Sequence, residues 1–99
     1  MNAAAMASWQ RLLAAALERR KNYPPEARSQ GEQGTATLAF RIDRAGNVHG
    51  ARIARSSGSS ALDRETLALL QRATPLPPPP ADVPGGEIPI SVPIRYSIK

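Results

Sequence analysis

The side chains that could catalyse a reaction or bind a metal are few in this chain of 99 residues. It has one histidine, His49, and no cysteine, so neither a two-histidine metal site nor a cysteine nucleophile is available. The serines between 56 and 60 lack the Gly-x-Ser-x-Gly context of a hydrolase nucleophile, and the glycines match no nucleotide-binding fingerprint. His49 has Asp43 and Arg41 nearby as ordinary surface partners. We therefore expect no enzymatic activity, no cofactor and no metal.

The charged residues favour an anionic partner only in general terms. Thirteen lysines and arginines against eight acidic residues give a net charge of +5, which suits nucleic acid, an acidic peptide or a membrane face. Apart from Arg19, Arg20 and Lys21, however, the basic residues are scattered, and none alternates with aromatic residues as in a single-strand binding surface. At a helix C-terminus this trio complements the helix dipole. We expect no nucleic acid partner, and a basic nucleic-acid-binding module stays an alternative.

The backbone of the last stretch, Glu87 to Lys99, offers a different kind of chemistry. Apolar residues fill the even-numbered positions, which is typical of a strand with one buried face. Pro89 and Pro93 are four residues apart, so both missing N–H groups lie on the same side of the strand. Because strand prolines are confined to edges and bulges, we predict an edge strand. Its even-numbered residues bond to a neighbouring strand, and its odd-numbered residues face an open edge.

That predicted edge still has N–H donors at Ser91, Arg95 and Ser97. Two interpretations stay open at this point. The prolines either blunt the edge against aggregation, or leave a docking surface for an extended segment of another chain.

The remaining elements must position this strand. A first helix is predicted over residues 1–21, with one stripe made of Met6, Trp9, Leu12, Leu13, Ala16 and Leu17. Ser8 is an alternative N-cap for a shorter helix beginning near Trp9. The helix must stop at Asn22 and Tyr23, because the residue before Pro24 is disfavoured in helical conformation. A segment containing the Tyr-Pro pair follows over residues 22–33.

A β-hairpin is predicted over residues 34–56. Gly34 to Asp43 alternates apolar and polar residues, residues 44–47 have turn chemistry, and a second strand runs from Val48 to about Ser56. Val48 is out of phase with the apolar residues that follow it, and Gly50 lies between them, which predicts a bulge at Gly50.

A second helix is predicted over residues 60–73, capped by Ser60 in a serine-x-x-acid motif. Residues 74–86 are rich in proline and predict a stiff, extended connection, with a ligand for a proline-binding module as the alternative. The last strand occupies residues 87–99. We therefore expect a single domain over residues 1–99 of the α+β class, a three-stranded antiparallel sheet covered on one face by two helices in the order α-β-β-α-β.

Several motifs occur in an order typical of one protein family. They are Tyr23-Pro24 followed by Ala27-Arg28, GTATLAFRIDRAGNVHGARIARSSG from Gly34 to Gly58, Leu62-Asp63 at a helix start, and VPIRYSI from Val92 to Ile98. Together, over about Asn22 to Lys99, they resemble the C-terminal domain of TonB, the energy transducer of Gram-negative bacteria. One departure is Thr74-Pro75-Leu76 and its proline run, where many relatives have an aromatic and basic stretch. It suggests a paralogue dedicated to one transporter, for example for haem uptake.

The resemblance implies a periplasmic domain, tethered in the full-length protein to the inner membrane by a proline-rich spacer and a membrane helix that lie outside this sequence. It implies ExbB and ExbD as inner-membrane partners. It also implies outer-membrane TonB-dependent transporters as partners, for uptake of siderophores, haem or similar nutrients. We expect a monomer or a weak dimer, with contact to the membrane only through that anchor.

In this family the transporter's short TonB box adds as a strand to the last strand, here the odd-numbered side of Glu87 to Lys99, and also touches the segment at the Tyr-Pro pair. The peptide-binding residues so implied are Arg20, Lys21, Asn22, Tyr23, Pro24, Glu87, Ser91, Arg95 and Ser97. The alternative is an envelope-spanning domain of the TolA type, which has a similar fold and serves colicin and phage-coat import.

Overall fold

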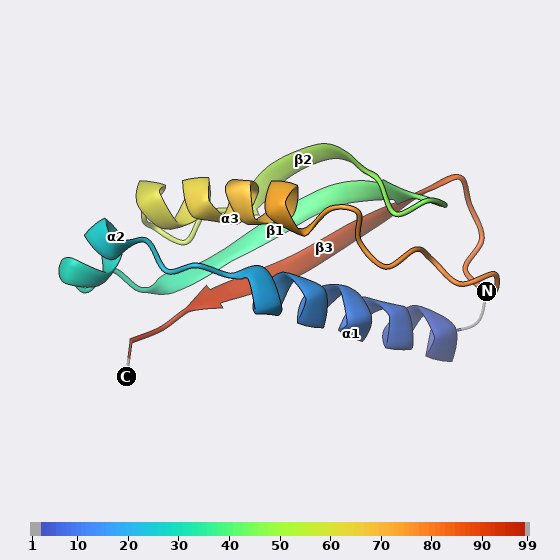
Figure 1. The fold of residues 1–99 in the computed structure, drawn as a ribbon, viewed down its shortest axis with the longest axis horizontal. Helices are drawn as coiled ribbons and strands as arrows, with labels where there is room; N and C mark the ends of the chain where they lie inside the picture. Colours follow the sequence, from blue (N-terminus) through green and yellow to red (C-terminus); the bar gives the residue numbers. More distant parts are fainter. Residues whose placement is uncertain (1–2, 99) are drawn as a thin grey trace.

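A long antiparallel pair of strands forms the centre of the fold. In the computed structural model, which describes residues 3–98, β1 (Gly34–Asp43) pairs with β3 (Glu87–Tyr96) through ten consecutive residue pairs (Figure 1). β2 (Val48–Arg55) lies on the other side of β1, so the strand order is β2-β1-β3 and all pairs are antiparallel. The alternation of the sequence explains the buried face, because every even-numbered residue of β3 from Ile88 to Tyr96 is buried.

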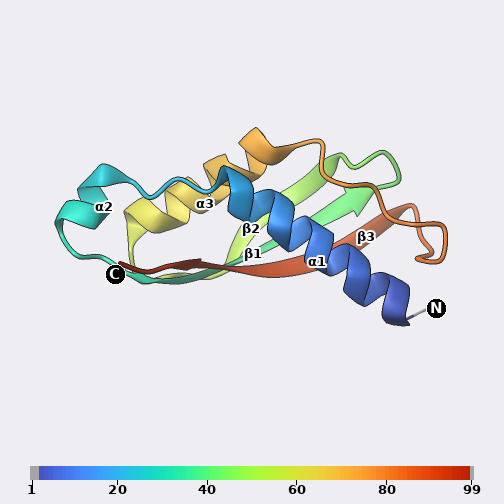
Figure 2. The same ribbon diagram turned by 60° about the horizontal axis from the view of Figure 1, so that its bottom comes forward.

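Helices cover one face of this sheet. α1 (Ala3–Arg20) and α3 (Ser60–Ala73) lie on the same side, and the short α2 (Pro25–Ser29) precedes β1 (Figure 2). The core between helices and sheet is aliphatic around one tryptophan and one tyrosine. Its fully buried side chains include Trp9, Leu13, Leu17, Leu38, Ile42, Leu62, Leu69, Leu70, Val83 and Tyr96. The predicted α+β fold and its order α-β-β-α-β are confirmed, with α2 as an addition. None of the helices within residues 3–98 has the length and apolar character needed to cross a bilayer.

The predicted bulge in β2 is present. Ala39 pairs with Arg52 and Arg41 pairs with His49, so two steps along β1 correspond to three along β2. Gly50 has a φ of +63°, and a Cβ there would lie 2.5 Å from Nη1 of Arg41. Glycine is therefore required by both backbone conformation and space. A second register shift, between Thr37 and Leu38, was not predicted from the sequence.

The proline-rich segment between α3 and β3 does more than connect them. Leu76 and Val83 are buried in the core, and the Leu76 N–H donates to the Gly46 carbonyl at 3.0 Å. The Trp9 indole N–H donates to the Pro77 carbonyl at 2.9 Å. The segment therefore closes the end of the core beside the hairpin turn.

Several predicted details were wrong for local reasons. Leu12 is 58% exposed, because it lies at the margin of the buried stripe of α1. Ser8 lies inside α1 and caps nothing, since the helix begins upstream of it. The N-cap of α3 is Ser59 in place of Ser60, with its Oγ accepting from the Leu62 N–H at 3.2 Å. α2 was missed, although Pro25 at its first position is a favourable helix start.

Three predicted elements, one helix and two strands, were too long at their C-terminal ends. α1 ends at Arg20 and β2 at Arg55, each one residue earlier than expected. β3 ends at Tyr96, because its partner β1 begins at Gly34, which pairs with that residue. Ile98 is consequently 39% exposed instead of continuing the buried face. The predicted ends at residues 1, 2 and 99 lie outside the described residues.

The Asp43 carboxylate organises the hairpin turn, and this generates a pH prediction. Its oxygens bond to His49 Nε2 at 3.0 Å, to the Asn47 N–H at 3.0 Å and to the Ala45 N–H at 2.9 Å. The His49 contact first, and then the backbone bonds, lower the pKa of Asp43 from 3.8 to about 2. A carboxyl group whose pKa is lower in the folded state than in the unfolded state stabilises the fold at a pH above its unfolded-state pKa. This contribution is lost as the pH falls through the folded-state pKa.

We predict that Asp43→Asn lowers the free energy of unfolding at neutral pH and that its difference from the unmodified chain shrinks between pH 3.8 and about 2. Urea unfolding across this range measures the difference. Asp82→Asn is the control, because that exposed side chain makes no hydrogen bond within residues 3–98. A pH-independent difference for Asp43→Asn would contradict the assignment.

Candidate functional site

β3 is an edge strand, as the spacing of its prolines predicts. In the register of the sheet, Pro89 lies opposite Arg41 and Pro93 lies opposite Thr37. Alternate pairs of an antiparallel ladder exchange hydrogen bonds, and proline cannot donate one. The pairs that bond β3 to β1 must therefore be the even-numbered ones, such as Ile90 with Phe40. The backbone groups of the odd-numbered residues of β3 point away from β1.

Two hydrogen bonds agree with this assignment. Lys21 Nζ, at the end of α1, donates to the carbonyl of Arg95 at 2.6 Å, so an odd-numbered carbonyl faces outward. Just past β3, the N–H of Ile98 donates to Gln33 Oε1 at 2.9 Å, so an even-numbered N–H faces the β1 side. Within residues 3–98, no strand pairs with the outward side of β3. We call this side the open edge of β3.

The open edge offers an uneven set of bonding groups. Glu87, Ser91 and Arg95 each present an N–H and a carbonyl, whereas Pro89 and Pro93 present a carbonyl only. Positions that can both donate and accept therefore recur every four residues, about 14 Å apart along the strand. Ser91 is the central one, and its backbone carbonyl and N–H have no partner in the described part of the chain.

Lys21 covers one end of this edge. Its ammonium group donates to the Arg95 carbonyl, forms an ion pair with Glu18 Oε1 at 2.6 Å and lies 5.5 Å from the centre of the Tyr96 ring. The Lys21 side chain is 22% exposed, so three contacts hold it in a partly enclosed position. The carbonyl of Arg95 is thus occupied before any other chain approaches.

The Tyr-Pro segment packs against the last residue of β3. The rings of Tyr23 and Tyr96 meet edge to face, with centroids 5.6 Å apart and planes at 83°. The Tyr23 hydroxyl donates to the Glu32 carbonyl, and the Tyr96 hydroxyl lies 3.0 Å from Thr66 Oγ1 in α3. Burial raises the pKa of Tyr96, so its hydroxyl stays protonated at neutral pH. The end of β3 is therefore joined to both α3 and the Tyr-Pro segment.

An ion pair on α3 fixes the same segment from the other side. The carboxylate of Glu65 accepts from Arg72 at 2.5 Å and from the Asn22 N–H at 3.1 Å. The Arg72 guanidinium also donates to the Arg20 carbonyl at 2.9 Å. The two side chains lie two turns apart on one face of α3. The sequence analysis did not identify Glu65 and Arg72, because their role depends on contacts with the Tyr-Pro segment, which is distant in the sequence.

The structure therefore divides the predicted peptide-binding residues into two groups. Lys21 lies at the end of the open edge, and Tyr23 packs behind it. The backbones of Arg20 and Asn22 bond to α3, and Pro24 precedes α2 as its N-cap. The side chains of Glu87, Ser91 and Arg95 on β3 are exposed, and so is that of Ser97, which lies just past the end of the strand.

The described residues were also compared with the requirements of a metal site. The residues from 3 to 98 contain no group of three or more histidine, cysteine or acidic side chains that could hold a metal ion. His49, the lone histidine, is used in the hairpin turn with Asp43. What the site offers is a row of backbone donors and acceptors.

Comparisons with known proteins place these features in a family. The sequence profile of the family described as Gram-negative bacterial TonB protein C-terminal matches residues 19–98. Protein TonB of Pseudomonas putida is 40% identical over 98 residues, which are 98% of this chain and 40% of that protein. Protein TonB of Pasteurella multocida strain Pm70 is 39% identical over 82 residues, which are 83% of this chain and 31% of that protein. The chain thus spans less than half the length of these curated relatives.

Two solved structures are also similar. The NMR solution structure of Helicobacter pylori TonB-CTD has a TM-score of 0.80 at 23% identity, covering 100% of this chain and 95% of that one, and supports the fold alone. The structure of HasB CTD has a TM-score of 0.64 at 36% identity, covering 100% of this chain and 79% of that one.

The Glu65–Arg72 pair generates a prediction about the Tyr-Pro segment. Glu65→Gln removes the charge that holds Arg72 and weakens the bond from Asn22, and we expect a loss of about 1 kcal/mol in the free energy of unfolding. Faster amide hydrogen exchange at Asn22, measured by NMR, is the specific sign. Arg64→Gln is the control, because its exposed pair with Glu26, at 3.5 Å, contributes little. Unchanged exchange at Asn22 would contradict the role of the pair.

Proposed function

Because this chain belongs to the family of Gram-negative bacterial TonB C-terminal domains, we propose that the open edge of β3 binds an extended segment of an outer-membrane transporter, its TonB box, as an added strand. The family consists of energy transducers, which are not enzymes. The observation that carries the proposal is the outward direction of the backbone groups of Ser91 and Arg95, on an edge that no strand within residues 3–98 pairs with.

The arrangement suits the transmission of a pulling force. A strand added to β3 and pulled along its length loads its hydrogen bonds together in shear, so bonds of about 1 kcal/mol each resist as a set. β3 passes the load to β1 through ten consecutive pairs, and β1 is the central strand of the sheet. The buried side chains of both strands then anchor the load in the core under α1 and α3.

The wider context of the proposal is periplasmic. We infer that the domain belongs to a longer protein anchored in the inner membrane, where ExbB and ExbD supply energy derived from the proton-motive force. The transported substrate would be a siderophore, haem or a similar nutrient. The family match and the curated relatives named TonB support this context.

A substitution at Ser91 tests strand addition. Ser91→Pro removes the N–H of the central position of the open edge, and the loss of one bond of about 1 kcal/mol weakens binding of a TonB-box peptide about fivefold. The fold stays intact, because this N–H does not bond to β1. Isothermal calorimetry of peptide binding and urea unfolding measure the two effects.

Ser91→Ala is the matched control, since it removes the same hydroxyl but keeps the N–H, and it should bind like the unmodified chain. Equal peptide affinity for the two variants would show that this N–H is not used. Slow hydrogen exchange of the Ser91 N–H in the peptide-free domain would instead place this N–H on the β1 side.

Another prediction concerns Lys21, whose ammonium group must leave the Arg95 carbonyl before an added strand can bond there. Lys21→Met frees this carbonyl in advance, so we expect peptide affinity to rise about threefold to fivefold, the size of one modest hydrogen bond. Arg19→Met is the control, because that exposed side chain lies in the last turn of α1, two residues before Lys21, and makes no ion pair within residues 3–98. Weaker binding by Lys21→Met would mean that Lys21 contacts the peptide directly.

A further inference from the structure

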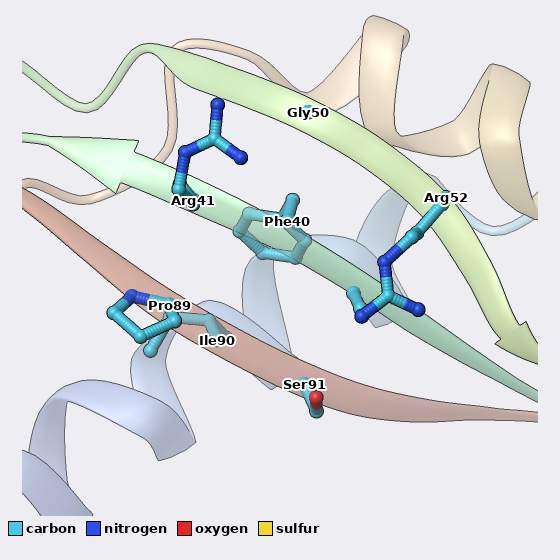
Figure 3. A pocket seen from close by; sticks show the side chains of 8 residues that line it. Phe40, Arg41, Gly50, Arg52, Pro89, Ile90 and Ser91 are labelled. Carbon is cyan, nitrogen blue, oxygen red and sulfur yellow. The ribbon is translucent and has the colours of Figure 1, made fainter.

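The sheet has one face that no helix covers in the described part of the chain. α1 and α3 both lie on the other face, against the buried even-numbered side chains of β3 (Figure 2). Side chains of a strand leave the sheet perpendicular to its plane and alternate between faces, so the odd-numbered side chains of β1 and β3 point away from the helices. In Figure 3 the helices lie behind the strands. We call this surface the helix-free face.

Three arginines on the helix-free face have no partner. Arg52 and Arg55 of β2 pair with odd-numbered residues of β1, and Arg95 is an odd-numbered residue of β3, so all three side chains leave the sheet on this face. All three are exposed, and within residues 3–98 none makes an ion pair or a side-chain hydrogen bond. An unpaired guanidinium group can bind a phosphate or carboxylate through two parallel hydrogen bonds.

The acidic residues of the chain do not compensate this charge. Two of the eight lie on the helix-free face, and both are already engaged, Glu87 with Arg41 at 2.8 Å and Asp43 with His49 at 3.0 Å. The other six lie in helices or loops; they are Glu18, Glu26, Glu32, Asp63, Glu65 and Asp82. The helix-free face therefore has three available guanidinium groups and no available carboxylate, which favours an anionic partner.

The remaining side chains of this face favour a lipid surface over a protein. Most of them are small or short and polar; these are Thr35, Thr37, Ala39, Pro89, Ser91 and Pro93. The large exposed apolar side chains of residues 3–98 lie elsewhere, at Leu12, Leu67 and Ile98. A stable protein interface needs an apolar or aromatic centre, which this face lacks. A bilayer with anionic headgroups attracts nearby arginines through charge alone.

A hollow on the helix-free face offers space for a headgroup. Its volume is about 310 Å³, and its lining includes Arg41, Arg52, Gly50 and Ser91 (Figure 3). Nε of Arg41 is bound to Glu87, whereas the Arg52 guanidinium is free. Gly50 adds room, because a Cβ there would lie 2.5 Å from Nη1 of Arg41. A phosphate group in the hollow can therefore accept hydrogen bonds from Arg52 without displacing an existing ion pair.

We propose that the helix-free face docks on an anionic phospholipid bilayer, with Arg52, Arg55 and Arg95 contacting headgroup phosphates. This contact is additional to the membrane anchor expected in the full-length protein. It leaves the open edge of β3 accessible, because a strand added there extends the sheet sideways and covers neither of its faces. A domain lying flat on a bilayer presents its open edge parallel to the membrane surface.

Co-sedimentation of the full chain with lipid vesicles tests the proposal. We expect binding to vesicles made of equal parts of phosphatidylglycerol and phosphatidylcholine, and none to vesicles of phosphatidylcholine alone. Arg52→Gln and Arg55→Gln should each weaken binding about fivefold, and the double variant about 25-fold, as for arginines close to an anionic surface. Urea unfolding should be unchanged, because both side chains are exposed and unpaired.

Arg19→Gln is the matched control. It removes the same charge from an exposed position of α1, on the other face of the sheet, where solvent ions screen its attraction to a bilayer. We expect a change of less than about twofold for this variant. Equal losses for Arg19→Gln and Arg52→Gln would reveal an effect of net charge without a defined face, and would overturn the proposal.

Two other results would also contradict it. One is the absence of binding to the phosphatidylglycerol vesicles. The other is soluble polyglutamate that binds more tightly than these vesicles and depends equally on Arg52, which would identify an acidic protein as the partner. Strand addition stands in each case, because vesicle binding is measured without a peptide and Ser91 takes no part in it.

Discussion

The absence of two amide hydrogens, at Pro89 and Pro93, determines how β3 is used. Since both prolines have the same parity, β3 can bond fully to a neighbour only through its even-numbered residues. The even-numbered residues also have the buried side chains, because successive side chains of a strand alternate between the two faces of the sheet. One sequence pattern thus sets the hydrogen-bonding side, the buried face and the position of β3 at the end of the sheet.

An open edge is a risk of aggregation as well as a binding surface, and the structure limits the risk locally. Two of its five odd-numbered positions have no donor, and the ammonium of Lys21 occupies the carbonyl of a third, Arg95. What remains is a short set of bonding groups centred on Ser91, which is too interrupted for an extended sheet.

The features that could be predicted from the sequence are those that depend on the periodicity of apolar residues. The alternation of apolar and polar residues identified the strands β1 and β3, and the equal parity of the two prolines identified the edge. The interrupted alternation around Gly50 identified the bulge. The structure contains all three features. These features are visible in a sequence because the pleat repeats every two residues.

The contacts that position the site could not be predicted in this way. Lys21 bonds to the Arg95 carbonyl across 74 positions of sequence, and Arg72 bonds to the Arg20 carbonyl across 52. Both bonds join a side chain to a backbone carbonyl, a group that every residue has, so no residue pattern marks the acceptor. The Arg41–Arg52 hollow likewise depends on the exact register at the β2 bulge.

The most direct test of the open edge is residue-specific amide hydrogen exchange along β3, with and without a TonB-box peptide. In the free domain, the account predicts slow exchange at Ile90 and Val92, which bond to β1, and fast exchange at Ser91. Added peptide should slow exchange at Ser91 and leave its two neighbours unchanged. Slow exchange at Ser91 in the free domain, or no change there in a domain saturated with peptide, would contradict the account.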